Sequence, residues 1–146
     1  MFFSDEQLQE ALREFKDESL ELLAAMEEAL LAIQDGGNVS EHINAVFRAA
    51  HTIKGSAGML KLEYVVKFTH VTENLLDEVR NGHIVLTEPM IDVLLQCKDH
   101  MQQLVLVFGD GNKKEIDSDL ETISAMLIDR LKNFLGTSTD EESQPQ

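Results

Sequence analysis

The feature that most constrains this chain is the spacing of its apolar residues, which follows the period of an α-helix along five successive segments. Apolar side chains recur three or four residues apart, as they must to form one face of a helix. No stretch alternates apolar and polar residues as a half-buried strand would. Proline occurs only twice in 146 residues. We therefore expect an all-α protein.

Capping residues predict where these helices begin. Ser4 and Gln7 form a capping-box pattern, and Ser118 and Glu121 form a second one. Ser40 is the expected N-cap of another helix. The five expected helices cover about residues 5–34, 41–60, 62–81, 88–108 and 119–135.

Short connections between long helices favour antiparallel neighbours. We therefore expect an up-down antiparallel bundle, with a four-helix core and a fifth, C-terminal helix. The sequence leaves open whether the fifth helix completes this bundle or packs against another copy or domain. The helical domain is expected to span residues 1–136, and the small, polar and acidic residues 137–146 are expected to form a flexible tail or linker.

The charge of the chain limits the classes of partner. Lys and Arg number 12 against 27 Asp and Glu, a net charge of −15, which argues against binding to nucleic acid or to an anionic membrane surface. No apolar run approaches the ~20 residues of a membrane helix. With one cysteine, Cys97, no internal disulfide is available, and a cytoplasmic location is expected. Glu-x-x-His motifs are absent, so we expect no metal site.

The most informative stretch surrounds His51. Gly55 and Gly58 follow it by four and seven residues, so the three share one helix face. A glycine within a helix costs about 1 kcal/mol relative to alanine, so this face is expected to stay bare and accessible. Lys54 lies beside it and adds a cation. The alternative is that the glycines let another helix pack closely and that His51 is an ordinary surface residue.

A second patch lies on the next expected helix, where His70 and Glu73 are three residues apart and share a face. If that helix runs antiparallel, Glu73 could accept a hydrogen bond from the Nδ1–H of His51. The other ring nitrogen, Nε2, would then be the unprotonated nucleophile. The alternative is that Glu73 is a solvated residue on a charged helix.

The stretches 47–58, with His-x-x-Lys-Gly at its centre, and 69–77 resemble histidine phosphotransfer domains. The resemblance is greatest to the amino-terminal phosphotransfer domains of CheA-type chemotaxis histidine kinases, and it extends to about residue 135. It departs at Lys61, where many relatives have a glycine in the turn.

The resemblance implies a role for each matching residue. His51 would accept a phosphoryl group on Nε2, Glu73 would orient it, and Lys54 would steady the phosphoryl oxygens. His70 would belong to the hydrogen-bonded cluster around them. The phosphoryl group would come from ATP bound to a separate CheA-type kinase domain and would pass to an aspartate of a CheY- or CheB-type response regulator. The chain itself carries no nucleotide-binding motif, so no cofactor is expected in this domain.

Two other functions remain open at this point. The acidic first segment could make the chain a non-catalytic helical interaction module. Within the family, the chain could be a stand-alone phosphorelay protein, which the long first and fifth helices and the polar C-terminal residues disfavour. We therefore expect an amino-terminal domain excised from a histidine kinase, a transferase, that acts as phosphoryl acceptor and donor without an ATP site of its own.

Overall fold

The computed structural model of the chain describes residues 4–110 and 115–143, and this part of the chain forms five α-helices and no strand. The all-α prediction is therefore confirmed. The helices are α1 (Asp5–Gln34), α2 (Val39–Met59), α3 (Glu63–Arg80), α4 (Glu88–Phe108) and α5 (Ser118–Ser143).

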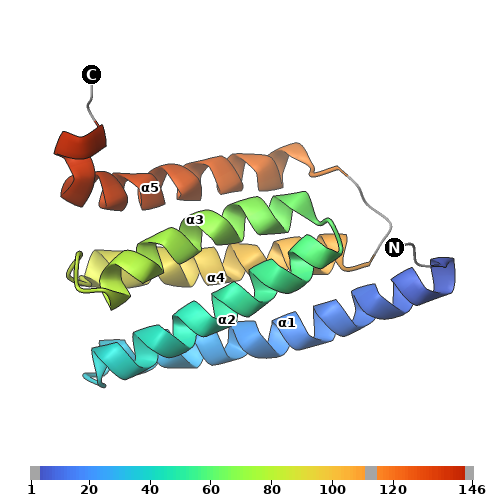
Figure 1. Cartoon of the computed structure of the whole chain (residues 1–146), viewed down its shortest axis with the longest axis horizontal. Helices are drawn as coiled ribbons and strands as arrows, with labels where there is room; N and C mark the ends of the chain where they lie inside the picture. The colour runs from blue at the N-terminus through green and yellow to red at the C-terminus, as the bar shows by residue number, and fades with distance from the viewer. Residues whose placement is uncertain (1–3, 111–114, 144–146) are drawn as a thin grey trace.

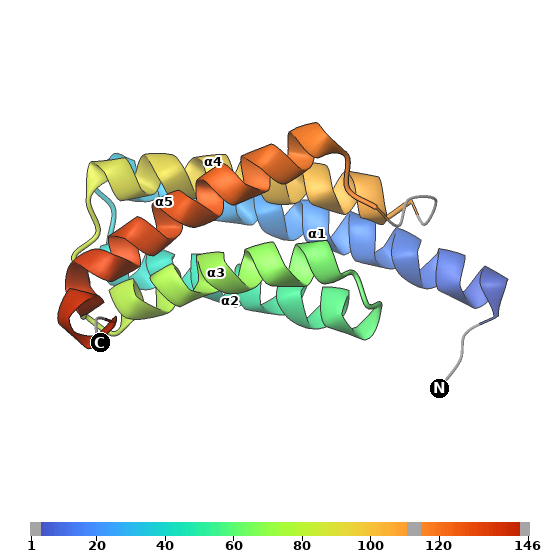
Figure 2. The same ribbon diagram turned by 90° about the horizontal axis from the view of Figure 1, so that it is seen from above.

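The first four helices form a closed ring. Helix α1 packs against α2 and α4, and α3 packs against the same two helices from the other side. Successive helices alternate in direction (Figure 1). Helix α5 lies outside the ring against α3 and α4, as the second view also shows (Figure 2). The predicted four-helix core with an added fifth helix is confirmed, and the fifth helix packs against this chain's own bundle.

The apolar faces of the helices meet in one core. Helix α5 packs against α3 and α4, and its side chains Leu127 and Leu131 are buried, at 2% and 0% exposure. Burying a side chain of this size contributes roughly 1.5–3 kcal/mol. Cys97 is fully buried, and this burial raises the pKa of its thiol to about 12, so the thiol stays protonated. No helix in the described part of the chain is long and apolar enough to cross a bilayer.

The capping box of Ser4 and Gln7 is confirmed, but two other predicted helix starts are wrong. Asn38, not Ser40, caps α2, because its side-chain oxygen accepts a hydrogen bond from the Glu41 amide at 2.9 Å. Asp117, not Ser118, does so for α5, accepting from the Leu120 amide at 3.0 Å. Asn, Asp and Ser are nearly equivalent as N-caps, so residue type alone does not choose between neighbours.

The predicted end of the fifth helix at Leu135 is also wrong, because α5 continues through Gly136 to Ser143. A glycine ends a helix readily when it adopts a left-handed conformation, as Gly36 and Gly82 do at φ 96° and 80°. Gly136 lies within α5. The role of residues 137–146 as a tail or linker stays a prediction, and 144–146 lie outside the described residues.

The turn between α2 and α3 places Lys61 in the left-handed region, at φ 60°. The amide of the next residue, Leu62, donates to the carbonyl of Ala57 at 2.9 Å, a bond typical of a helix that ends in this conformation. The turn therefore has the backbone that a glycine would favour, although a side chain there costs roughly 1–2 kcal/mol.

Candidate functional site

The candidate site lies where α2 packs against α3. Nδ1 of His51, on α2, is hydrogen-bonded to Oε2 of Glu73, on α3. Because a carboxylate can only accept, the ring nitrogen donates. The His51 side chain is 63% exposed, whereas that of Glu73 is only 8% exposed. The buried carboxylate therefore holds the exposed ring through Nδ1, and Nε2 is the ring nitrogen that takes no part in this bond.

Lys54, one turn after His51 on α2, is a second partner of Glu73. Its Nζ lies 2.5 Å from Oε1 of Glu73, so the two carboxylate oxygens serve two different partners. Burial by itself would raise the pKa of Glu73. Hydrogen bonds and positive charge from Lys54 and His51 outweigh burial and bring the pKa below its usual value. Glu73 is therefore ionised at neutral pH, as a fixed acceptor must be.

The two glycines beside His51 leave a bare surface. A Cβ added at Gly55 or Gly58 would meet nothing within 4 Å, and both positions are exposed. Within the described part of the chain no helix packs closely against them, which contradicts the alternative of close helix packing. Two weak helix formers therefore leave this part of the α2 surface without covering side chains.

His70 lies one turn before Glu73 on α3, and its side chain is exposed. Among the described residues it makes no hydrogen bond to His51, Glu73 or Lys54. The hydrogen-bonded cluster forms without it, contrary to what the resemblance implied. A role for His70 in phosphoryl transfer stays a prediction.

Sequence reasoning missed a stack of side chains beside the cluster. The Phe47 ring lies parallel to the His51 ring, with centroids 5.8 Å apart and planes at 10°. The guanidinium of Arg80 lies 3.9 Å from the Phe47 centroid. The spacing of four residues between Phe47 and His51 is a usable signal. Arg80 offers none, because its position depends on how α3 is rotated against α2.

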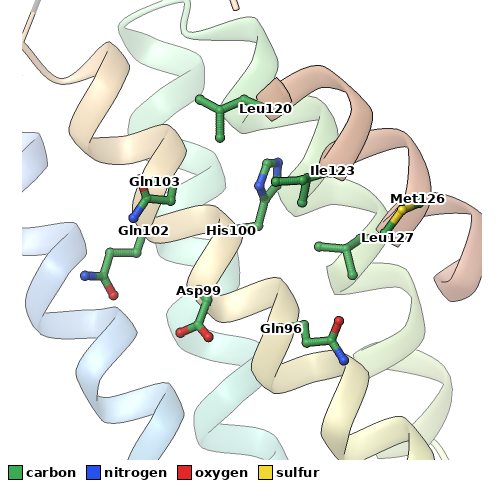
Figure 3. Close-up of a pocket in the computed structure, with 9 residues that line it drawn as sticks. All are labelled: Gln96, Asp99, His100, Gln102, Gln103, Leu120, Ile123, Met126 and Leu127. Atoms are coloured by element: carbon green, nitrogen blue, oxygen red, sulfur yellow. The ribbon is translucent and has the colours of Figure 1, made fainter. Parts of the chain in front are cut away.

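A hollow of about 450 Å³ lies elsewhere, between α4 and α5 (Figure 3). His100 points into this interface toward Leu120 and Ile123. His100 is buried, at 3% exposure, and its Nε2 lies 2.5 Å from Oγ of Ser124. Burial lowers its pKa. Helix α5 does not pack against α2, so this hollow is separate from the His51 cluster.

The chemistry of the cluster is that of an exposed nucleophile. It offers an exposed imidazole, an ionised carboxylate bonded to the Nδ1 of that ring, and an adjacent ammonium. Within the described residues, no three His, Cys, Asp or Glu side chains gather so as to hold a metal ion. Such a cluster suits the transfer of an anionic group to and from another protein.

Comparison with known proteins agrees with this chemistry. Residues 10–106 match the family model described as the Hpt domain. The chain is 43% identical over 104 residues to the chemotaxis protein CheA of Salmonella typhimurium, which covers 71% of this chain and 16% of that protein. It is 33% identical over 128 residues to the CheA of Borreliella burgdorferi, covering 87% of this chain and 14% of that protein. The chain thus spans about one sixth of these relatives.

Two solved structures are also similar. One is the phosphorylated P1 domain of CheA3 in complex with CheY6 from R. sphaeroides, with a TM-score of 0.77 and 26% identity over 86% of this chain and 98% of that one. The other is the histidine phosphotransfer domain of CheA in solution, with a TM-score of 0.70 and 31% identity over 86% of this chain and 92% of that one.

Proposed function

The chain belongs to the Hpt domain family, and on that basis we propose that His51 carries a phosphoryl group from a kinase to a response regulator. One observation carries the assignment of the residue. His51 is an exposed imidazole whose Nδ1 is bonded to a buried, ionised carboxylate on a neighbouring helix. No other described histidine combines these properties with an adjacent lysine and a bare helix face.

The first transfer begins with the lone pair of His51 Nε2, which attacks the γ-phosphorus of a nucleoside triphosphate held by the kinase. A nitrogen–phosphorus bond forms, and the bond to the nucleoside diphosphate breaks. The proton stays on Nδ1, and the positive charge that develops on the ring is stabilised by Glu73. In the second transfer an aspartate oxygen of the regulator attacks phosphorus, and the electron pair of the N–P bond returns to Nε2.

Lys54 supplies the second electrostatic contribution. Its ammonium is paired with Glu73, and its side chain is 25% exposed, so it is able to move toward solvent. We assign it to the phosphoryl oxygens once they arrive, because phosphoryl transfer depends mainly on positioning and charge neutralisation. The assignment of Glu73 and Lys54 to separate tasks follows from their different burial.

We propose that the donor is a CheA-type kinase domain and the acceptor a CheY- or CheB-type regulator, all in the cytoplasm. The similarity to CheA over about one sixth of its length supports a domain of a larger kinase. The similar P1 domain that was solved in complex with CheY6 supports a regulator as the acceptor.

Phosphate labelling tests this proposal. The domain is incubated with labelled ATP, with and without a CheA-type kinase core, and the site is mapped by mass spectrometry at neutral or alkaline pH. We expect acid-labile label on His51, only in the presence of the core. His51→Gln should abolish labelling with little change in the unfolding temperature. His83→Gln is the matched control, because His83 is also an exposed histidine whose Nδ1 is hydrogen-bonded to a glutamate, Glu78. Label on His51→Gln at the wild-type rate would overturn the proposal.

A further inference from the structure

The His51 ring is held by two contacts of different kinds. Its Nδ1 is bonded to Glu73, and its face lies against the ring of Phe47. A single hydrogen bond fixes one atom and leaves a planar ring free to tilt about that bond. Because the side chain is 63% exposed, general packing does not restrict the tilt. The contact with Phe47 therefore restricts the tilt of the ring, which the bond to Glu73 does not.

Phe47 is well suited to set the plane of the imidazole. It precedes His51 by one helical turn, and their planes differ by only 10°. The centroid separation of 5.8 Å lies within the range of offset aromatic stacking. A ring in this position resists tilting of its neighbour, and the His51 side chain beside it is still 63% exposed.

Phe47 is itself held in place from α3. The Arg80 guanidinium lies 3.9 Å from its centroid, which is a favourable cation–π distance. Asp77 fixes the guanidinium, because its Oδ1 accepts hydrogen bonds from Arg80 Nε at 3.2 Å and Nη2 at 2.9 Å. Asp77 thus holds Arg80 in its place over Phe47.

These contacts form two cross-connections between α2 and α3. His51 meets Glu73, and Phe47, one turn earlier on α2, meets Arg80, two turns later on α3. This order of contacts is the one expected for antiparallel helices. Both contacts therefore fix the position of the imidazole relative to the same pair of helices, α2 and α3. We propose that Phe47 and Arg80 are positioning residues, which fix the plane of the His51 ring for in-line attack while Glu73 fixes its tautomer.

This inference rests on the proposed function of His51 and deepens it. The reacting lone pair lies in the plane of the ring, so a tilted ring directs Nε2 away from phosphorus. Misplacement of a reacting atom by about 1 Å costs up to about a hundredfold in rate. Loss of the stack should therefore lower kcat for phosphorylation and leave the binding of the donor, measured by KM, in place.

The test compares four variants of the domain with wild type. Phe47→Leu removes the aromatic plane and keeps an apolar side chain, and Phe47→Tyr restores the ring. Arg80→Gln removes the cation over Phe47. Arg13→Gln is its matched control, because Arg13 also pairs with a carboxylate three residues away, Glu10, but has no part in the site. Each is phosphorylated by a kinase core with ATP and, separately, by phosphoramidate, which needs no docking.

For Phe47→Leu we expect kcat to fall about tenfold with KM within about twofold, and we expect Phe47→Tyr to recover most of the rate. Arg80→Gln should show a smaller loss, about threefold, with both donors. Arg13→Gln should match wild type. Wild-type kcat in Phe47→Leu would overturn the proposal. Equal behaviour of Arg80→Gln and Arg13→Gln would overturn the part assigned to Arg80.

Nitrogen-15 NMR of the His51 ring separates positioning from damage to the fold. In Phe47→Leu the ring-proton shifts should change, because the neighbouring ring current is lost, while Nδ1 stays protonated by its bond to Glu73. Loss of the Nδ1–H tautomer would contradict the division of roles. If wild type takes no label from either donor, the proposed function fails, and the NMR comparison still decides whether Phe47 sets the ring plane.

Discussion

At the scale of single residues, Glu73 joins stability to function. Its carboxylate is nearly buried, holds the His51 ring with one oxygen and pairs with Lys54 through the other. The unfolded chain loses both partners. Because its pKa is lowered in the folded state, Glu73 contributes stability above the unfolded pKa of about 4.5. That contribution disappears as the pH falls through the lower, folded value.

Glu73→Gln should therefore affect both properties. The amide keeps the shape but not the charge, so the ring is held less firmly and we expect phosphorylation of His51 to slow by up to about a hundredfold. At pH 7 the variant should also unfold more easily than wild type, and the difference should shrink below about pH 4. Initial labelling rates and denaturant unfolding at both pH values measure this. A constant difference in unfolding free energy at all pH values would contradict the role of the charge.

Lys61 has a backbone conformation that is unfavourable for a residue with a side chain. Its φ of 60° suits glycine, and nothing about the turn requires the lysine side chain, which is exposed. Lys61→Gly should stabilise the domain by about 0.5–1 kcal/mol, less than the full left-handed penalty because glycine also loosens the unfolded chain. Denaturant midpoints report the change, and Lys67→Gly, within α3, should instead destabilise by a similar amount. A destabilised Lys61→Gly would show that the lysine side chain contributes to the turn.

At the scale of elements, the bare face of α2 allows the stability of the helix and the access of a partner to His51 to be changed in opposite directions. Gly55→Leu places a side chain in open space and removes a weak helix former, so the unfolding free energy should rise by about 0.5–1 kcal/mol. Transfer from the kinase core should fall sharply, because the leucine stands where the partner approaches. Ala125→Leu, at an exposed position of α5, is the matched control. Undiminished transfer in Gly55→Leu would contradict the access argument.

The elements also show what a sequence can predict. The apolar period predicted five helices. The spacing of three residues placed His51 and Lys54 on one side of their helix, and antiparallel packing of the next helix made a hydrogen bond from His51 to Glu73 possible. Boundaries at Asn38 and Asp117 were missed, since several equivalent caps lie side by side. The end of α5 was missed because a glycine lowers helix stability without ending the helix.

The features that the sequence could not predict depend on how two helices are rotated relative to each other. The stack of Arg80 on Phe47 requires a particular rotation of α3 against α2, which is set by packing along the whole interface. The burial of His100 has the same origin, because α5 covers a polar position of α4. Local pattern carries no information about either.

At the scale of the whole molecule, two buried titrating groups lower the stability of the fold in two different ranges of acidic pH. Burial lowers the pKa of His100, so the unfolded chain takes up a proton before the folded one does. Stability is complete above the unfolded pKa of about 6.5 and falls as the pH decreases below it. Glu73 acts in the same direction but only below about 4.5.

Wild type should therefore lose unfolding free energy in two separate steps on acidification. His100→Gln, which can still bond Ser124, should abolish the first step, whose slope cannot exceed about 1.4 kcal/mol per pH unit for one group. Denaturant unfolding between about pH 7.5 and 5.5 measures it. Equal slopes for wild type and His100→Gln would show that another group is responsible.

The bare strip of α2 beside His51 has a consequence for signalling logic. A nucleophile on a convex helix, with open space at Gly55 and Gly58, has no enclosure of its own. Exclusion of water and recognition of the cargo must then be provided by whichever protein docks. In the proposed function, discrimination among incoming proteins therefore depends on those proteins, and the same exposed helix face can serve several of them in turn.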